Sequence, residues 1–106
     1  ELGRYFLAGL AELQADAMSI LEVRGRGLMI GIELRPEWSG QGPEMARRLL
    51  ESGFMVNYQP HNRAFRLFPP YVISTREIDG FLDAFRSVLA DAEQGQRALA
   101  AAGGGS

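Results

Sequence analysis

The chain has 106 residues, 11 basic against 13 acidic, and a formal net charge of −2. This length predicts one small domain with a single core, and it is short for a complete enzyme. The charge balance gives no electrostatic reason to expect nucleic acid or an anionic membrane as a partner. No apolar run approaches the roughly 18 to 20 residues that span a bilayer, and without cysteine there is no disulfide framework or thiolate metal site.

The basic residues have an unusual composition. Every one of them is an arginine apart from a single histidine, because the sequence contains no lysine. The chain therefore cannot form a Schiff base through its own side chains.

The first third predicts a helix followed by a β-hairpin. Apolar residues in steps of three or four predict an amphipathic helix from Leu2 to about Ile20. A short strand at Ile20–Val23 and an alternating strand that runs to Leu34 follow it, and Gly25 and Gly27 allow a turn between them. These glycines lead into a strand and not into a helix, which excludes a dinucleotide-binding loop.

The middle of the chain predicts a second helix and a second pair of strands. The segment Arg35–Gly42 has the composition of a loop, and Pro43 suits the first position of a helix that ends near Ser52. A strand is expected at Phe54–Tyr58, a turn at Gln59–Arg63, and a returning strand at Ala64–Phe68 that Pro69 and Pro70 end.

The last helix carries the strongest local signal. Ser74 and Glu77 form an S-x-x-E capping box, and an apolar stripe then predicts a helix to about Glu93. The element order predicts an α+β fold, with a mainly antiparallel sheet of three to four strands and helices packed on one face. Residues 1–93 form the expected domain, and 94–106 read as a flexible tail or linker. The start at Glu1 without a capping signal suggests a cut through a longer protein.

Few side chains suggest chemistry. His61 lies in a predicted turn with no second histidine or cysteine, so a surface role is expected. Glu33, Asp79 and Asp83 are expected on solvated faces, and the serines lack a nucleophile motif. Trp38 is either an anchor for a ligand or partner or a residue that packs over the domain's own edge.

Arg66 is the exception, because it lies inside an apolar strand. Phe65 and Leu67 should point to one face of the sheet and Arg66 to the other. The arginine could pair across the sheet with Glu33 or Glu22, or bind the carboxylate of a partner or substrate in bidentate geometry.

Two segments together resemble a known family. They are VRGRGLMIGIEL at Val23–Leu34 and FRLFPPYVISTREID at Phe65–Asp79, with a helix and the GFMV segment between them. In this order they resemble the C-terminal small domain of class III pyridoxal-phosphate-dependent aminotransferases, which include the ornithine, acetylornithine and 4-aminobutyrate transaminases. The resemblance covers Leu2 to about Ala92, and it departs from the family at Tyr71, where leucine is usual.

The resemblance implies a fold-type I enzyme whose large domain, absent from this chain, holds pyridoxal 5'-phosphate, its lysine and an acidic partner of the ring. It implies that Arg66 lies at the edge of the active site and binds a substrate carboxylate or an acidic residue of the large domain. No catalytic, cofactor-binding or metal-binding residue is expected in this chain, which would be inactive alone. The resemblance also implies amine or amino acid and 2-oxo acid substrates and a homodimer, and a cytoplasmic location is expected.

Two other interpretations stay open from the sequence. The chain could be a free-standing α+β binding or regulatory module for a small carboxylate ligand or a protein partner. It could also be an α+β domain with no activity.

Overall fold

The computed structural model describes residues 2–26, 29–67 and 74–104, and the side chains of 3–25, 29–67 and 74–95. The described elements alternate helices with pairs of strands. In chain order they are α1 (Leu2–Asp16), β1 (Ile20–Arg26), β2 (Met29–Leu34), the 3-10 helix η1 (Pro36–Gln41), α2 (Gly42–Glu51), β3 (Asn57–Gln59), β4 (Ala64–Leu67) and α3 (Thr75–Gly104).

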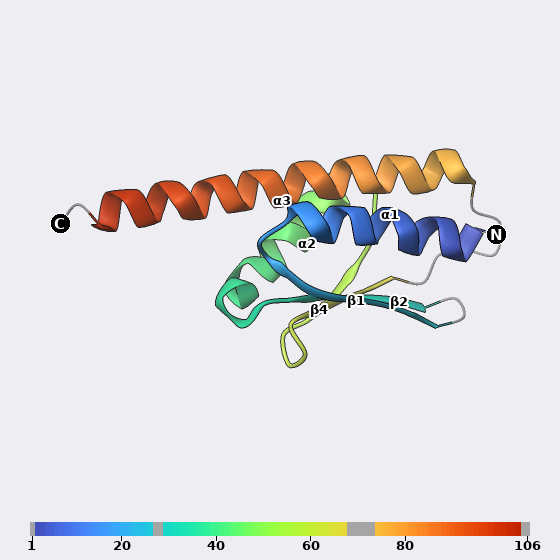
Figure 1. Ribbon diagram of the computed structural model, residues 1–106, viewed down its shortest axis with the longest axis horizontal. Helices are drawn as coiled ribbons and strands as arrows, with labels where there is room; N and C mark the ends of the chain where they lie inside the picture. Colours follow the sequence, from blue (N-terminus) through green and yellow to red (C-terminus); the bar gives the residue numbers. More distant parts are fainter. Residues whose placement is uncertain (1, 27–28, 68–73, 105–106) are drawn as a thin grey trace.

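The four strands form one antiparallel sheet in the order β1-β2-β4-β3. Helices α1 and α3 run side by side above the sheet, and α2 lies on the same side (Figure 1). The predicted fold class, an α+β arrangement with an antiparallel sheet and helices on one face, is confirmed. The opposite face of the sheet carries no helix among the described elements.

The core lies between the helices and the inner face of the sheet. Its strand members alternate with outward residues, and its helix members recur at helical spacing, as the sequence predicts. The buried hydrophobic side chains of this cluster are Phe6, Leu10, Leu13, Ile20, Ile30, Ile32, Leu34, Trp38, Met45, Leu49, Phe65, Leu67, Ile78, Phe81, Phe85, Val88 and Leu89. Edge-to-face ring contacts, such as 5.8 Å between the centroids of Phe65 and Phe85, join the sheet to α3.

The end of α1 and the start of β3 differ from the prediction. Helix α1 ends at Asp16 and not near Ile20, because Ile20 pairs with Leu34 at the start of β1. Strand β3 begins at Asn57 and not at Phe54, because the Phe54 amide donates to the Leu49 carbonyl at the end of α2. The first boundary is set by a strand pairing across the sheet and the second by a backbone bond at the end of α2, and periodicity extends both elements too far.

Gly25 has another role than the predicted turn. It lies inside β1 opposite Ile30, so the predicted hairpin is present but its connection falls at 27–28, outside the described residues. A Cβ atom on Gly25 would lie 2.6 Å from Cδ1 of Leu7. Glycine at this position therefore allows α1 to approach β1 closely.

The predicted loop at Arg35–Gly42 is in part helical, because Pro36–Gln41 forms η1. Trp38 on η1 is only 6% exposed and belongs to the core, which confirms that it packs against its own domain. Helix α2 is as predicted, and Gly53 follows it with φ of 96°. Leu50 on this helix is 56% exposed, although it is apolar.

The capping box at the start of α3 is confirmed. The Glu77 amide donates to Oγ of Ser74 over 3.1 Å, and the Ser74 amide donates to Oε1 of Glu77 over 3.0 Å. The predicted helix end near Glu93 is wrong, because α3 continues to Gly104. The predicted domain limits of 1–93 and 94–106 and the flexibility of the second segment stay predictions. The double proline and Tyr71 lie outside the described residues.

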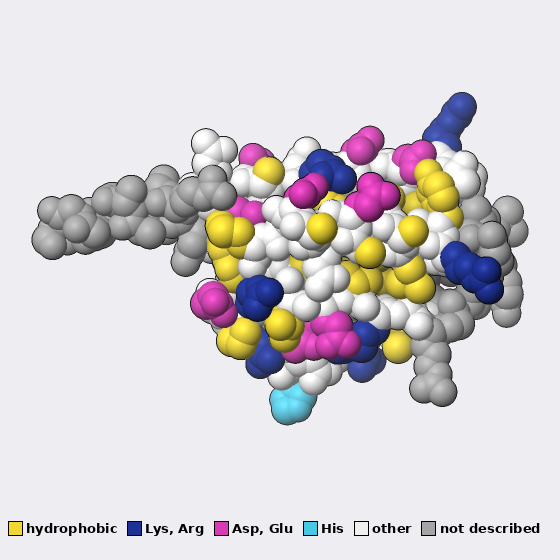
Figure 2. All heavy atoms as spheres, in the orientation of Figure 1, with side chains coloured by type: hydrophobic (Ala, Val, Ile, Leu, Met, Phe, Trp, Pro, Cys, Tyr) yellow, Lys and Arg dark blue, Asp and Glu magenta, His cyan; other side chains and the backbone are white. Residues whose placement is uncertain are grey.

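The surface carries charges of both signs. Figure 2 shows basic and acidic side chains interspersed over one side of the molecule, with apolar side chains exposed between them. None of the helices in the described ranges has the length and apolar character needed to cross a membrane.

Candidate functional site

Arg66 lies on β4, an inner strand, and belongs to the face of the sheet that no described helix covers, here called the open face. Phe65 and Leu67, on either side of it in β4, are 1% and 7% exposed and point into the core. Strand alternation therefore turns Arg66 to the opposite face. Because β4 pairs with β2 on one side and β3 on the other, the base of the Arg66 side chain is fixed by two ladders.

Four residues form a row across this face. Arg24 of β1 lies opposite Gly31 of β2, Gly31 opposite Arg66 of β4, and Arg66 opposite Asn57 of β3. Gly31 has no side chain, and a Cβ atom there would meet nothing within 4 Å. A hollow of about 480 Å³ lies over this position, lined by Arg24, Gly25, Met29, Gly31, Asn62, Ala64 and Arg66.

Glu33 is the carboxylate that organises the charges beside the hollow. Its Oε1 accepts from Nη1 of Arg24 over 3.0 Å, and its Oε2 accepts from Nη2 of Arg63 over 3.3 Å. Arg24 also pairs with Glu22 at 3.1 Å. The hydrogen bond to Glu33 raises the pKa of the Arg24 guanidinium further above its ordinary value.

Arg66 forms no hydrogen bond or ion pair with any other described residue. The cross-sheet pair with Glu33 or Glu22 that the sequence left open is thus not formed, because Arg24 and Arg63 occupy these carboxylates. Arg66 is partly buried beside the hollow and always charged at physiological pH. An outward guanidinium without a partner among the described residues, set in a hollow, can bind a carboxylate with two parallel hydrogen bonds.

Arg63 reaches Glu33 from a strained backbone. Its φ of 54° makes it the one non-glycine residue with positive φ in the part of the chain described. The turn that places it is closed by bonds from the Asn62 amide to Gln59 and from the Arg63 amide to Pro60. Its Nε atom is buried and has no partner among the described residues. Both features cost stability, so the ion pair of Arg63 with Glu33 forms at a conformation that the turn would otherwise disfavour.

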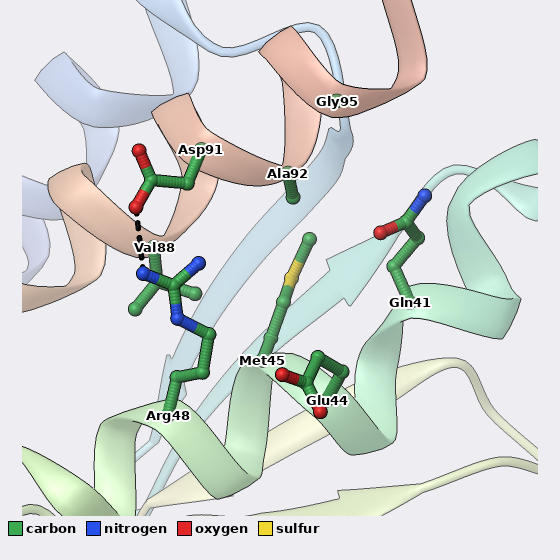
Figure 3. Close-up of a pocket in the computed structure, with 8 residues that line it drawn as sticks. All are labelled: Gln41, Glu44, Met45, Arg48, Val88, Asp91, Ala92 and Gly95. Atoms are coloured by element: carbon green, nitrogen blue, oxygen red, sulfur yellow. Dashed lines mark hydrogen bonds and ion pairs between the residues drawn. The ribbon is translucent and has the colours of Figure 1, made fainter. Parts of the chain in front are cut away.

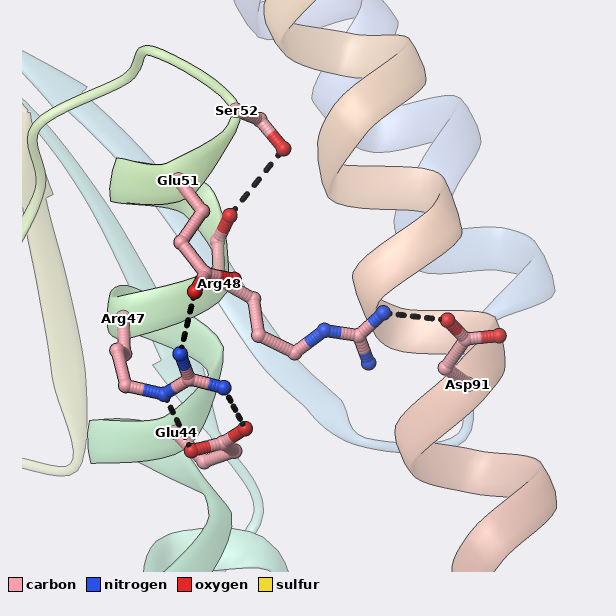
Figure 4. Close-up of polar contacts among 6 residues, drawn as sticks. All are labelled: Glu44, Arg47, Arg48, Glu51, Ser52 and Asp91. Atoms are coloured by element: carbon pink, nitrogen blue, oxygen red, sulfur yellow. Dashed lines mark hydrogen bonds and ion pairs between the residues drawn. The ribbon is translucent and has the colours of Figure 1, made fainter.

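A second hollow, of about 370 Å³, lies between α2 and α3 (Figure 3). Arg48 of α2 spans it, and its Nη2 donates to Asp91 of α3 over 2.6 Å. Beside it Arg47 binds Glu44 and Glu51 on α2 itself (Figure 4). The charged groups at this hollow form ion pairs with one another, so it is a groove between packed helices and a weaker candidate than the sheet face.

The remaining predicted polar residues do not gather into a site. His61 is exposed in the turn between β3 and β4, and Asp79 accepts a hydrogen bond from the hydroxyl of Tyr5. No group of metal-ligating side chains occurs in the described ranges. Sequence reasoning missed Arg24 and Arg63 as neighbours of Arg66. Strand alternation could have placed Arg24 on the outer face, whereas nothing in the sequence marks Arg63.

Comparison with known proteins shows the family to which this chain belongs. A profile of the family described as "Aminotransferase class-III" matches residues 1–89. The chain belongs to the class III aminotransferase family. It is 36% identical over 89 residues to the acetylornithine aminotransferase of Caldanaerobacter subterraneus, which covers 84% of this chain and 22% of that protein.

Another relative and a solved structure give the same family. Ornithine aminotransferase 2 of Staphylococcus saprophyticus is 41% identical over 89 residues, or 84% of this chain and 21% of its own. Among solved structures, an ornithine delta-aminotransferase of Plasmodium falciparum superposes with a TM-score of 0.78 at 26% identity, over 89% of this chain and 24% of that one. The chain thus spans less than a quarter of the length of these relatives.

Proposed function

We propose that this chain is the C-terminal small domain of a pyridoxal-phosphate-dependent aminotransferase. The whole enzyme would move an amino group between an amine or amino acid and a 2-oxo acid. The family membership supports this proposal, as does the small share of each relative that the chain spans. The observation that carries the role of this domain is the outward Arg66, without a described partner, beside the hollow on the open sheet face.

The cofactor itself is not held by these residues. Pyridoxal phosphate supplies an electron sink for the carbanion that forms at the substrate's Cα. The chain has no lysine to bind the aldehyde of this cofactor, so its residues do not fit the group. We place the cofactor site, its lysine and the acidic residue that pairs with the ring in a large domain outside this chain.

Arg66 would act by orientation. A guanidinium does not lose its proton in proteins, so it serves neither as a general acid nor as a general base. Two parallel hydrogen bonds to a carboxylate would fix both the position and the rotation of the substrate. The buried neighbours Phe65 and Leu67 and the two strand ladders hold the base of this side chain in place.

The identity of the carboxylate is part of the proposal. We infer that Arg66 binds the carboxylate of the amino acid or 2-oxo acid substrate, and that an acidic residue of the large domain is the alternative partner. A cytoplasmic homodimer completes the proposal on the basis of the resemblance to the family. Light scattering of the full-length enzyme would measure its oligomeric state.

The test uses Arg66→Ala and Arg66→Lys in the full-length enzyme. Loss of a charged hydrogen bond predicts that KM for the carboxylate substrate rises about tenfold or more in Arg66→Ala, with little change in cofactor content. Arg66→Lys keeps the charge but not the bidentate geometry, so its KM should lie between those of the unsubstituted enzyme and Arg66→Ala. Arg86→Ala on α3, away from the sheet face, is the control. Unchanged kinetics for every carboxylate substrate would leave Arg66 with a structural role.

The same hollow supports the second candidate, a free-standing module that binds a small carboxylate. Calorimetry of the isolated chain with amino acids and 2-oxo acids separates the two. A free-standing module should bind one of them unaided, whereas a domain that supplies half of a site should show no measurable heat. Pyridoxal phosphate added to the isolated chain should likewise give no absorption band of a cofactor bound through lysine.

A further inference from the structure

Glu33 is the carboxylate best placed to neutralise Arg66. It lies opposite Ala64, two residues before Arg66 on β4, so Glu33 and Arg66 are diagonal neighbours on one face. Side chains in this relation have Cβ atoms about 7 Å apart, within reach of a glutamate and an arginine. Free of other contacts, Glu33 would be drawn to Arg66 by direct attraction.

Two other arginines hold Glu33 instead. Each oxygen of its carboxylate accepts from a different guanidinium, Oε1 from Arg24 and Oε2 from Arg63. The Glu33 side chain is only 16% exposed, so these contacts are partly shielded from solvent. Arg24 reaches it diagonally from β1, two residues beyond Glu22, which lies opposite Glu33. Arg63 reaches it from the turn that precedes β4.

The charges on this face show the consequence. Three described arginines, Arg24, Arg63 and Arg66, stand against two glutamates, Glu22 and Glu33. The glutamates are shared between Arg24 and Arg63, so the one uncompensated positive charge of this group is that of Arg66. The unfavourable φ of Arg63 and its buried Nε, which has no partner among the described residues, indicate that this arrangement is maintained at a cost in stability.

We propose that Arg24 and Arg63 are positioning residues that hold Glu33 away from Arg66 and so keep Arg66 available for the substrate carboxylate. The proposal rests on the function proposed above for Arg66. It gives Arg24 and Arg63 an effect on substrate binding without any contact between them and the substrate.

The test is the double variant Arg24→Gln/Arg63→Asn in the full-length enzyme. Asparagine tolerates the left-handed backbone at position 63, so the turn should keep its shape. Glu33 should then turn to Arg66 and compete with the substrate, so KM for the carboxylate substrate should rise about fivefold to tenfold while kcat changes little. Adding Glu33→Gln to the double variant should return KM to near its starting value, because no competing carboxylate remains.

A second measurement separates this competition from a general loss of positive charge. A crystal structure of the double variant should show an oxygen of Glu33 within about 3 Å of the Arg66 guanidinium. The control Arg47→Gln/Arg86→Gln removes the same number of positive charges, but from α2 and α3, and should leave KM within about twofold. If the double variant does not fold, the single variant Arg24→Gln tests the same shift with a smaller rise in KM.

The outcomes are distinct. A raised KM with Glu33 still in its present place, or no rescue by Glu33→Gln, overturns the positioning role while leaving the role of Arg66 intact. An Arg66→Ala variant with unchanged KM overturns the proposed function of Arg66 itself, and the positioning role falls with it.

Discussion

Glu93 on α3 accepts two hydrogen bonds from Ser19, the residue immediately before β1. The backbone amide and the hydroxyl of Ser19 reach Oε2 of Glu93 over 3.1 and 2.7 Å, and both residues are buried. Because these residues lie 74 positions apart, the contact ties the last helix to the point where the first helix gives way to the sheet.

We predict that Glu93→Ala destabilises the fold. The substitution leaves the buried amide and hydroxyl of Ser19 without an acceptor, which should lower the free energy of unfolding by about 2 to 3 kcal/mol. Glu93→Gln retains an acceptor oxygen and should cost less. Urea unfolding of both variants, with the exposed neighbour Gln94→Ala as control, checks this. An equal effect from Gln94→Ala would show that Ser19 is not the reason.

Gly42 and Gly95 predict opposite results for the same substitution. A Cβ atom on Gly42 would overlap the ring of Tyr58, whose hydroxyl donates to the Ser39 carbonyl, so Gly42→Ala should cost about 1 to 3 kcal/mol. A Cβ atom on Gly95 meets nothing within 4 Å inside α3. Gly95→Ala should therefore stabilise the fold by about 0.5 to 1 kcal/mol. Thermal unfolding of both variants should shift Tm in opposite directions.

The capping box predicts that Ser74→Ala lowers stability by about 1 kcal/mol. The variant removes the hydroxyl that accepts from the Glu77 amide at the first turn of α3. Ser87→Ala, at an exposed position within the same helix, is the matched control and should change little. Chemical unfolding gives both values. A loss at Ser87 as large as that at Ser74 would contradict the capping role.

The Arg47 cluster on α2 predicts a pH dependence. The hydrogen bond from Arg47 lowers the pKa of Glu44 below its ordinary value of 4.5 (Figure 4). A carboxyl group with a lower pKa in the folded state stabilises the fold fully above its unfolded pKa, and this contribution is lost as the pH falls through the folded value. The effect should be small, because all these side chains are exposed to solvent.

Arg47→Gln should therefore be less stable than the unsubstituted chain near neutral pH, and the difference should shrink as the pH falls below the ordinary pKa of 4.5. Urea midpoints of both chains, measured near neutral pH and at acidic pH, test this. Arg86→Gln, whose ion pair with Asp16 is long at 3.7 Å, is the control and should show a weaker dependence. A stability difference that grows on acidification would contradict the lowered pKa of Glu44 as its cause.

The fold class, and the face of the sheet to which each side chain of β4 points, follow from the sequence alone. Alternation in β4 and the apolar stripes of the helices are local patterns, and burial follows them because one face of each element must leave water. Phe65, Leu67 and Phe85 are accordingly buried, and Arg66 faces outward. The capping box at Ser74 is equally local and was readable from four residues.

Which charges meet depends on the tertiary structure. Periodicity placed Glu33 and Arg66 on one face and left them free to pair. It does not predict how β1, β2 and β4 align, or that the side chain of Arg63 in the turn reaches Glu33. The pairing of β1 with β2 brought Arg24 to Glu33, and the left-handed backbone at Arg63 brought a second guanidinium. These contacts depend on how separate elements pack together, and so do those that bury Glu93 against Ser19 and stop α1 before Ile20.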